Sequence, residues 1–174
     1  MGWMIDYTHS EISFQVRHMM ITNVKGHFDS YRAKIDVSDL KDLNSANIYF
    51  EFDVASINTK SKERDDHLRS ADFFNADKYP KITFQSTSIS GNSFYYEIEG
   101  DLTIRDITKR VVFSVKYNGS VKNPWGTKVY GFEGSARINR DEFQLTWNTA
   151  LKNGGLLVSN EIKIFIDLEL SKDT

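Results

Sequence analysis

The chain has four histidines, His9, His18, His27 and His67, whose imidazoles are suited to metal binding. Zinc sites usually bring their ligands together through short spacings such as His-x-His or His-Glu-x-x-His. None of the four histidines stands in such a pair, and the nine-residue spacing of the first three matches neither of these ligand spacings. The chain also has no cysteine that could supply a thiolate. We therefore expect no metal site, and we interpret His18 as a hydrogen-bonded histidine of a strand.

The string Arg64-Asp65-Asp66-His67 contains the carboxylates and the imidazole that general acid–base catalysis would use. It falls in a charged, helix-like segment that we expect to be exposed, where salt bridges and capping are the usual roles of such side chains. No glycine-rich phosphate loop precedes a helix, and Gly154-Gly155 precede a strand-like run. A serine nucleophile elbow is absent as well. The residues therefore predict no catalytic site and no enzyme activity.

Length and charge narrow the class of protein. The 174 residues fit a single domain, 1–174, and Lys+Arg 22 against Asp+Glu 24 gives a formal net charge of -2. Because no basic block is present, we expect no nucleic-acid partner. No apolar run has the length needed to cross a bilayer, and no signal peptide is visible at the N-terminus. The expected compartment is the cytoplasm, or the periplasm or exterior if a leader has been removed.

The dominant pattern is an alternation of apolar and polar residues with a period of two, which is typical of strands that are dry on one face. It is regular in segments 12–16, 46–54, 96–104 and 162–170 and weaker in 24–37, 82–89, 111–117 and 130–138. About eight half-dry strands must form a sandwich or close into a barrel.

Two segments depart from the alternation. Apolar parity changes within 24–37, so a β-bulge or bend is expected near Asp29-Ser30. In Ser61–Phe74 the apolar residues Leu68, Ala71 and Phe74 fall at helical spacing, which predicts a short helix over one end of the sheet.

The inward parity of these strands predicts an interior rich in large apolar side chains. An eight-stranded barrel can be filled by such side chains or can enclose one ligand, and alternation does not separate the two cases. The expected interior is Phe14, Val16, Phe28, Ile35, Ile48, Phe50, Phe52, Ile82, Phe84, Tyr96, Ile98, Phe113, Val115, Phe132 and Ile164.

Several strings, in the same order along nearly the whole chain, resemble the YceI-like family. They run from His9 to Met19, Gly26 to Phe28, Arg64 to Phe74, Tyr79 to Phe84, Gly100 to Ile104 with Thr108-Lys109, Asn123 to Gly126 and Ile138 to Phe143, followed by Trp147-Asn148 and Gly154-Gly155. The resemblance implies a lipocalin-like, extended, eight-stranded antiparallel β-barrel with an internal apolar tunnel. It also implies binding of polyisoprenoids, isoprenoid quinones or similar amphiphiles, no catalytic residue, and a homodimer as a further option. Arg140 is expected to pair with a nearby carboxylate or carbonyl, and Trp147 to plug the barrel or line its mouth.

The leading hypothesis is therefore non-catalytic binding, transport or storage of a long apolar lipid, with no other cofactor. An enzyme acting on the head group of a bound isoprenoid lipid and a filled, stress-protective barrel without ligand are the alternatives. In the leading hypothesis His18 and Tyr96 would orient the head group. The candidate ligand-binding residues are Phe14, Val16, His18, Phe28, Ile35, Ile48, Phe50, Phe52, Ile82, Phe84, Tyr96, Ile98, Phe113, Phe132 and Trp147.

Overall fold

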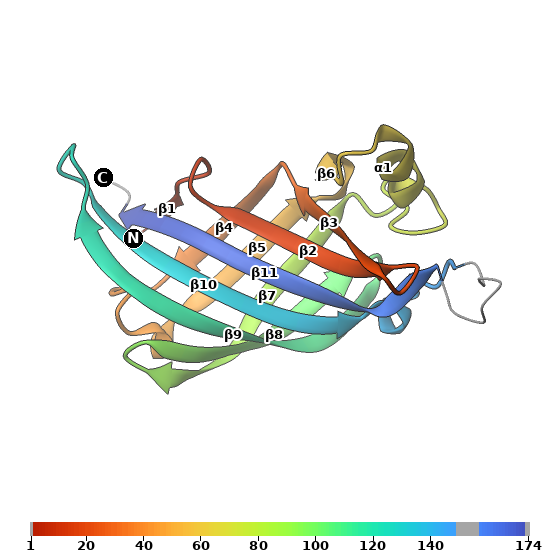
Figure 1. Ribbon diagram of the computed structural model, residues 1–174. Helices are drawn as coiled ribbons and strands as arrows, with labels where there is room; N and C mark the ends of the chain where they lie inside the picture. The colour runs from red at the N-terminus through yellow and green to blue at the C-terminus, as the bar shows by residue number, and fades with distance from the viewer. Residues whose placement is uncertain (1, 149–156, 173–174) are drawn as a thin grey trace.

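The computed structural model describes residues 2–148 and 157–172, and antiparallel strands dominate it (Figure 1). Alternating sequences form the strands because one face of each strand can then be buried while the other remains hydrated. The strands are β1 Trp3–Ile5, β2 Glu11–His18, β3 Thr22–Phe28, β4 Tyr31–Asp36, β5 Asn47–Asp53, β6 Ile57–Asn58, β7 Lys81–Asn92, β8 Tyr95–Ile104, β9 Ile107–Lys122, β10 Lys128–Asn139 and β11 Val158–Lys172. One α-helix, α1 Lys62–Arg69, and three 3₁₀ turns, η1 Leu43–Ser45, η2 Val54–Ser56 and η3 Arg140–Phe143, complete the described elements.

The strands form one curled antiparallel sheet in the order β4-β5-β7-β8-β9-β10-β11-β2-β3-β6, with β1 added beside β11. The two ends of this order are joined through the chain itself. β3 runs into β4 through the bend at Asp29-Ser30, and β5 runs into β6 through η2. The pair stays antiparallel across the corner, with His27 opposite Asn58 on one side and Tyr31 opposite Phe52 on the other. The sheet therefore closes into a barrel.

The predicted all-β antiparallel barrel is confirmed, and the strand count differs for a simple reason. Segment 24–37 is one bent strand that the hydrogen-bond pattern divides into β3 and β4, and the next is divided into β5 and β6. Counting each bent strand once gives eight barrel strands, and the short β1 is additional. The bend expected near Asp29-Ser30 is present at the point where parity changes.

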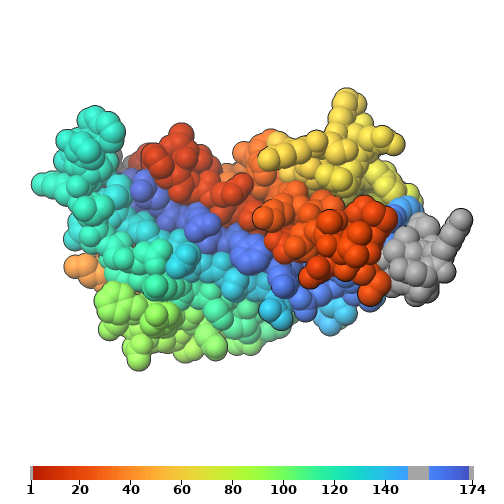
Figure 2. Space-filling model, viewed as in Figure 1, coloured from red at the N-terminus to blue at the C-terminus, as the bar shows by residue number. Residues whose placement is uncertain are grey.

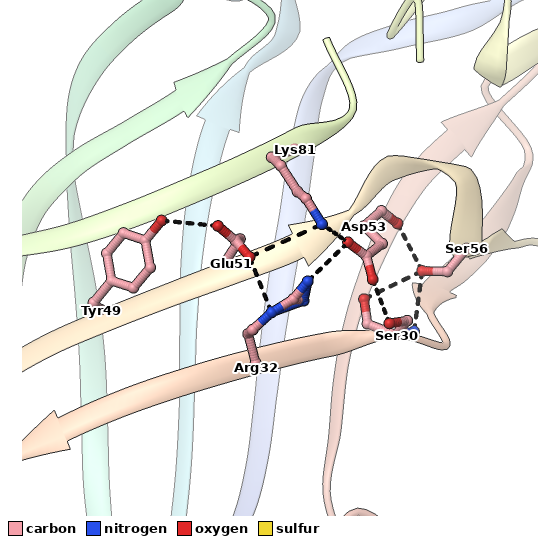
Figure 3. Close-up of polar contacts among 7 residues, drawn as sticks. All are labelled: Ser30, Arg32, Tyr49, Glu51, Asp53, Ser56 and Lys81. Atoms are coloured by element: carbon pink, nitrogen blue, oxygen red, sulfur yellow. Dashed lines mark hydrogen bonds and ion pairs between the residues drawn. The ribbon is translucent and has the colours of Figure 1, made fainter. Parts of the chain in front are cut away.

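A polar network on the outer surface holds the two bends together (Figure 3). Asp53, at the end of β5, accepts hydrogen bonds from Ser30 Oγ in one bend and from Lys81 Nζ on β7. Ser56 Oγ in η2 donates to the Asp53 carbonyl at 2.6 Å. The Lys81 and Ser30 hydrogen bonds, together with the Arg32 charge, lower the pKa of the Asp53 carboxyl. The corner is therefore fixed by a charged carboxylate.

The helix is shorter than the sequence predicts. It begins after Ser61, whose side chain accepts from the Arg64 amide at 3.2 Å, and it ends at Arg69. Residues 70–74, which were predicted to continue it, form turns because Ser70 leaves the helical conformation and its hydroxyl bonds back to the His67 carbonyl at 2.6 Å. No helix in the described part of the chain is long and apolar enough to cross a membrane.

Two different structures close the ends of the barrel. One end is filled by residues 37–46, here called the plug, in which Leu40 is 1% exposed and Leu43 is also buried. Trp3 Nε1 donates to the Val37 carbonyl at 3.0 Å and fixes the plug to β1. At the other end lie α1 and the turns that follow it to residue 74, here called the cap (Figure 1).

Candidate functional site

The interior of the barrel contains an apolar cavity of about 220 Å³. This volume is far above the roughly 10–15 Å³ that a single water needs. Of the side chains that line it, all but Ser13 and Arg140 are apolar. The barrel is therefore hollow along part of its length, which answers for this structure the question that alternation left open.

Most of the predicted interior residues lie on the wall of this cavity. Their positions follow from strand parity, because alternate residues of a strand face the same side of the sheet. Whether they contact a ligand stays a prediction. The predicted residues that line the cavity are Phe14, Val16, Phe28, Ile35, Ile48, Phe50, Phe52, Ile82, Phe84, Ile98, Phe113 and Phe132, together with Val115 and Ile164 from the wider interior set.

Three predicted residues, His18, Tyr96 and Trp147, do not belong to the cavity lining. His18 is the last residue of β2 and lies half-exposed at the strand end, where the pairing with β11 shifts register. Tyr96 points inward, but its hydroxyl donates to the Lys41 carbonyl at 2.9 Å and thereby joins β8 to the plug. The Trp147 ring packs on the cap, with its centroid 4.7 Å from that of His67. The role of His18 and Tyr96 in orienting a head group stays a prediction.

Sequence reasoning missed the part of the wall that comes from loops and turns. Period-two alternation ends where a strand ends, so it gives no parity for the plug, the cap or the segment after η3. The helical spacing did point to Leu68 and Phe74, but as a cover for the barrel end rather than as wall. The cavity-lining residues from these segments are Leu40, Leu43, Leu68, Phe73, Phe74, Arg140 and Leu145.

Two glycines give the aromatic wall its space. A Cβ at Gly26 would lie 2.4 Å from Phe14 Cζ, and a Cβ at Gly100 would lie 2.5 Å from Phe84 Cζ. Real carbon atoms do not approach so closely, so any side chain there would displace the ring. Gly26 and Gly100 thus form notches in β3 and β8 that accept the edges of Phe14 and Phe84.

Within the described part of the chain, Arg140 is the one charged residue that touches the cavity, and it is only 2% exposed. Its guanidinium donates to the carbonyls of Leu145, Trp147, Val158 and Ser159, the last at 3.0 Å. Burial lowers the pKa of Arg140 despite the opposing effect of Asp141. The expected carbonyl pairing is therefore present, and the side chain ties the segment after η3 to the start of β11.

The Arg64–His67 string attaches the cap to the barrel. Asp65, expected to be exposed, is buried instead, and it accepts hydrogen bonds from the Thr59 amide at 2.9 Å and the Thr59 hydroxyl at 2.6 Å. Arg64 donates to the same residue through Nε and Nη2. Asp66 pairs on the surface with Lys62 and Arg69. None of these carboxylates lines the cavity, so they act as structural contacts.

The structure brings together one group of metal-ligating types that sequence spacing did not reveal, Asp6, His9 and Glu169. His9 Nδ1 lies 2.8 Å from Asp6 Oδ2 and 3.7 Å from Glu169 Oε2. Hydrogen bonds from Thr8 and His9 lower the pKa of Asp6, and the Asp6 carboxylate raises the pKa of His9. His9 is exposed and the two carboxylates are partly buried. An ion pair accounts for its geometry.

Exposure divides the cavity wall into two halves. The lining side chains of β7, β8, β9 and β10 are buried. That of β3 and most of those of β2 and β11 keep partial exposure, with Ile12 and Leu170 as the buried exceptions. The cap residues Leu68 and Phe74 are also partly exposed. The accessible side of the cavity is therefore the side formed by β2, β3, β11 and the cap.

Comparison with known proteins agrees with this architecture. The chain is 37% identical over 167 residues to the UPF0312 protein SAB2563 of Staphylococcus aureus (strain bovine RF122 / ET3-1), which covers 95% of both chains. Burkholderia cenocepacia BcnA has the same fold, with a TM-score of 0.81 at 23% identity over 95% of this chain and 99% of its own. A polyisoprenoid binding domain from Saccharophagus degradans superimposes with a TM-score of 0.71 at 12% identity, covering 99% of both chains.

The YceI-like domain matches residues 3–170, which is nearly the entire chain. This match spans every described strand up to Leu170 on β11, together with the plug and the cap. The protein belongs to the YceI-like family.

Proposed function

We propose that this protein binds a long apolar lipid, such as a polyisoprenoid or an isoprenoid quinone, inside the barrel and carries or stores it without chemical change. The observation that carries the proposal is the hollow interior, which is lined almost entirely by hydrocarbon and phenyl groups. Apolar cavities of this kind stay dry and accept apolar guests. The fold is shared with a domain described as polyisoprenoid binding, which supports the same class of ligand.

The energetics favour a chain-like guest. Each buried CH₂ contributes roughly 0.8 kcal/mol, so a tail of many carbons supplies a large gross binding energy. Ordering of the tail removes part of this energy. Among the described residues of the wall only Ser13 and Arg140 are polar, which suits a hydrocarbon better than a compact polar metabolite.

The chemistry at the cavity argues for binding rather than for catalysis. Among the lining residues of segments 2–148 and 157–172, Arg140 is the sole titratable group, and its donors are engaged by four carbonyls. A general acid or base needs a group that can exchange a proton with the substrate near neutral pH. A guanidinium held in this way is poorly suited to that role.

Mass spectrometry of a solvent extract from the purified protein tests the proposal directly. We expect a stoichiometric lipid with a long hydrocarbon portion, and uptake of an added polyprenol after the native lipid has been removed. Ile164→Trp, which adds bulk to the cavity wall, should reduce this uptake. No extractable lipid and no uptake of added polyprenol by the unmodified protein would refute the proposal.

Stability measurements provide a second test with a matched pair of phenylalanines. Phe52 lines the cavity, whereas Phe143 is 1% exposed and does not line it. Truncation of Phe143 to alanine should lower the free energy of unfolding by about 3–5 kcal/mol. Phe52→Ala should lower it distinctly less in the lipid-free protein, because the ring already borders empty space. Equal losses would indicate a filled interior.

A further inference from the structure

The hairpin between β2 and β3 exposes three consecutive large apolar residues. Met20 is 59% exposed and Ile21 is 73% exposed, and Met19 beside them is also exposed. Single apolar residues are common on protein surfaces, but a contiguous group at a projecting tip marks a site of interaction. This group, Met19-Met20-Ile21, is called the tip.

The backbone conformation of the tip is a second indication that its large side chains serve an interaction. Met19 and Met20 have φ angles of 51° and 66°. Tight hairpin turns adopt such positive angles most readily with Asn-Gly or Gly-Gly, and large side chains there are strained. A turn of this shape would form more easily with small residues, so its folding does not account for the methionines.

The hairpin that carries the tip projects from the same end of the barrel as the cap (Figure 1; Figure 2). The contacts at its base place it at the rim of the cavity. The Met19 amide donates to the Leu157 carbonyl at 2.8 Å, and His18 is the register partner of Val158. Val158 lines the cavity, as does Val16, two residues before His18 on β2. A surface that contacted the tip would therefore also face the side through which the cavity wall is exposed.

Behind the tip, the outer face of the sheet carries a row of cations. Arg137 on β10 is opposite Lys163 on β11, Lys163 is opposite Gln15 on β2, and Gln15 is opposite Lys25 on β3. Register partners point to the same face of a sheet, and this face is the outer one because the neighbouring residues line the cavity.

Arg17 joins the row two positions beyond Gln15, on the same face. Within residues 2–148 and 157–172, none of the four cations forms an ion pair. Glu161 is the acidic residue of β11 on this face nearest to the row.

Glu161 lies within this basic zone, and the other acidic residues on the outer face of β10, β11 and β2 lie farther from the tip. Glu133 is opposite Asp167, and Asp167 is opposite Glu11. Apart from Glu161, the outer face of β10, β11 and β2 is thus basic near the tip and acidic farther away. The protein as a whole has a formal net charge of -2, so the basic zone is a local feature rather than a consequence of composition.

We propose that the tip and the cations behind it dock the protein on an anionic lipid membrane, with Met20 and Ile21 entering the interface and Arg17, Lys25, Lys163 and Arg137 facing acidic head groups. Apolar side chains flanked by cations are the combination that binds the interface of an anionic bilayer. Docking in this orientation would turn the accessible side of the barrel toward the membrane. This inference goes beyond the proposed function, because a barrel can hold lipid without contacting a membrane.

Cosedimentation of the full chain with vesicles tests the proposal. Vesicles of phosphatidylcholine with about 30% phosphatidylglycerol should bind the protein, vesicles of phosphatidylcholine alone should bind it much less, and added salt should weaken the binding. Two double variants test the two parts of the surface, Met20→Ser with Ile21→Ser and Lys25→Glu with Lys163→Glu. Each should reduce the binding constant at least about tenfold. For the charge variant this follows because one cation near such a surface contributes about fivefold.

Matched controls lie elsewhere on the surface. Trp125 is 85% exposed in the turn between β9 and β10, at the opposite end of the barrel (Figure 1). Lys34 is an exposed lysine on β4. Trp125→Ser and Lys34→Glu should leave vesicle binding unchanged, and melting curves establish that all four variants are folded.

A direct readout uses the absence of cysteine from the chain. A polarity-sensitive thiol dye on Met20→Cys should shift to the blue with anionic vesicles, and the same dye on Trp125→Cys should not. The proposal would be overturned if the unmodified protein did not bind vesicles. It would also be overturned if binding depended on Trp125 and not on the tip, or if the dye shifted to the blue only at position 125. Lipid extraction from the tip variants separates the two proposals, because retained lipid with lost docking would leave the carrier function intact.

Discussion

The two ends of the barrel are closed by different means. The plug is sealed by hydrocarbon, since Leu40 and Leu43 are almost fully buried inside the barrel. The cap is held by polar contacts, chiefly Asp65 and Arg64 on Thr59, and its Leu68 and Phe74 remain partly exposed. The plug can open only if its buried leucine side chains become exposed to water. A helix held by a few hydrogen bonds opens at a lower free energy. We therefore expect a ligand to enter and leave the cavity at the cap and not at the plug.

The largest effect should follow from truncation in the plug. Leu40→Ala should lower the free energy of unfolding by about 3–4 kcal/mol, because the residue is 1% exposed and leaves a cavity behind. Leu68→Ala in the cap should lower it by only about 1 kcal/mol, since that side chain is already partly exposed. Denaturant unfolding of both variants measures the difference. Equal losses would remove the distinction between the two ends.

Release of the cap from its anchor should have an intermediate effect. Asp65→Ala leaves the buried Thr59 amide and hydroxyl without their acceptor and should cost about 2 kcal/mol. It should also speed hydrogen exchange in α1 and the release of a fluorescent fatty acid from the barrel. Asp66→Ala is the control, because its ion pairs with Lys62 and Arg69 lie on the surface, where solvent screens them. Unchanged release from Asp65→Ala would mean that the cap is not the moving part.

Acid should loosen the corner of the barrel near the cap. The pKa of Asp53 is lowered in the folded protein by Lys81, Ser30 and Arg32. The stability that this carboxylate provides is therefore complete above its unfolded pKa near 3.8 and is lost as the pH falls through the lower folded value. Asp53→Asn should be less stable than the unmodified protein by about 1 kcal/mol at neutral pH, and the difference should shrink toward pH 3. Thermal melts across this range measure it. A constant difference would exclude the carboxylate charge as the cause.

The smallest expected effect concerns Asp6, His9 and Glu169, which lie beside β1 and the end of β11. We expect dialysis against a chelator to leave both the melting temperature and lipid binding unchanged, because the ion pairs already satisfy this group. His9→Gln serves as the comparison, since it removes the imidazole and keeps a polar side chain. Stoichiometric metal bound to the unmodified protein and absent from His9→Gln would contradict the expectation.

Period two was sufficient to locate the barrel wall because strand geometry leaves little freedom. Because Phe50 and Phe52 lie on one face of β5, every second residue of that strand lies on the same face. Phe84 on β7 is the register partner of Phe50, so it also points to this face. The change of parity at Asp29-Ser30 also had a local cause, the bend between β3 and β4. These features are encoded by neighbours in the sequence, so they could be predicted without the structure.

The remaining features depend on contacts between distant segments. Asp65 stands in a run of charges that is typical of a solvated helix, but the fold places Thr59 against it and buries it. Tyr96 has inward parity, yet only the position of the plug explains why its hydroxyl meets the Lys41 carbonyl. The cations Lys25, Lys163 and Arg137 are scattered in sequence, and strand register alone brings them into one row.

The pairing of β2 with β11 has a consequence for the order in which the molecule is built. Residues 14 and 164 are register partners although 150 positions separate them, whereas β7 to β10 form consecutive hairpins. Chain entropy delays contacts between distant residues, so the hairpins should form early and the β2–β11 contact should form among the last. Mutations at this contact should then act mainly on the unfolding rate. The accessible wall of the cavity is thus the last to be assembled, and a nascent barrel remains open there along its length.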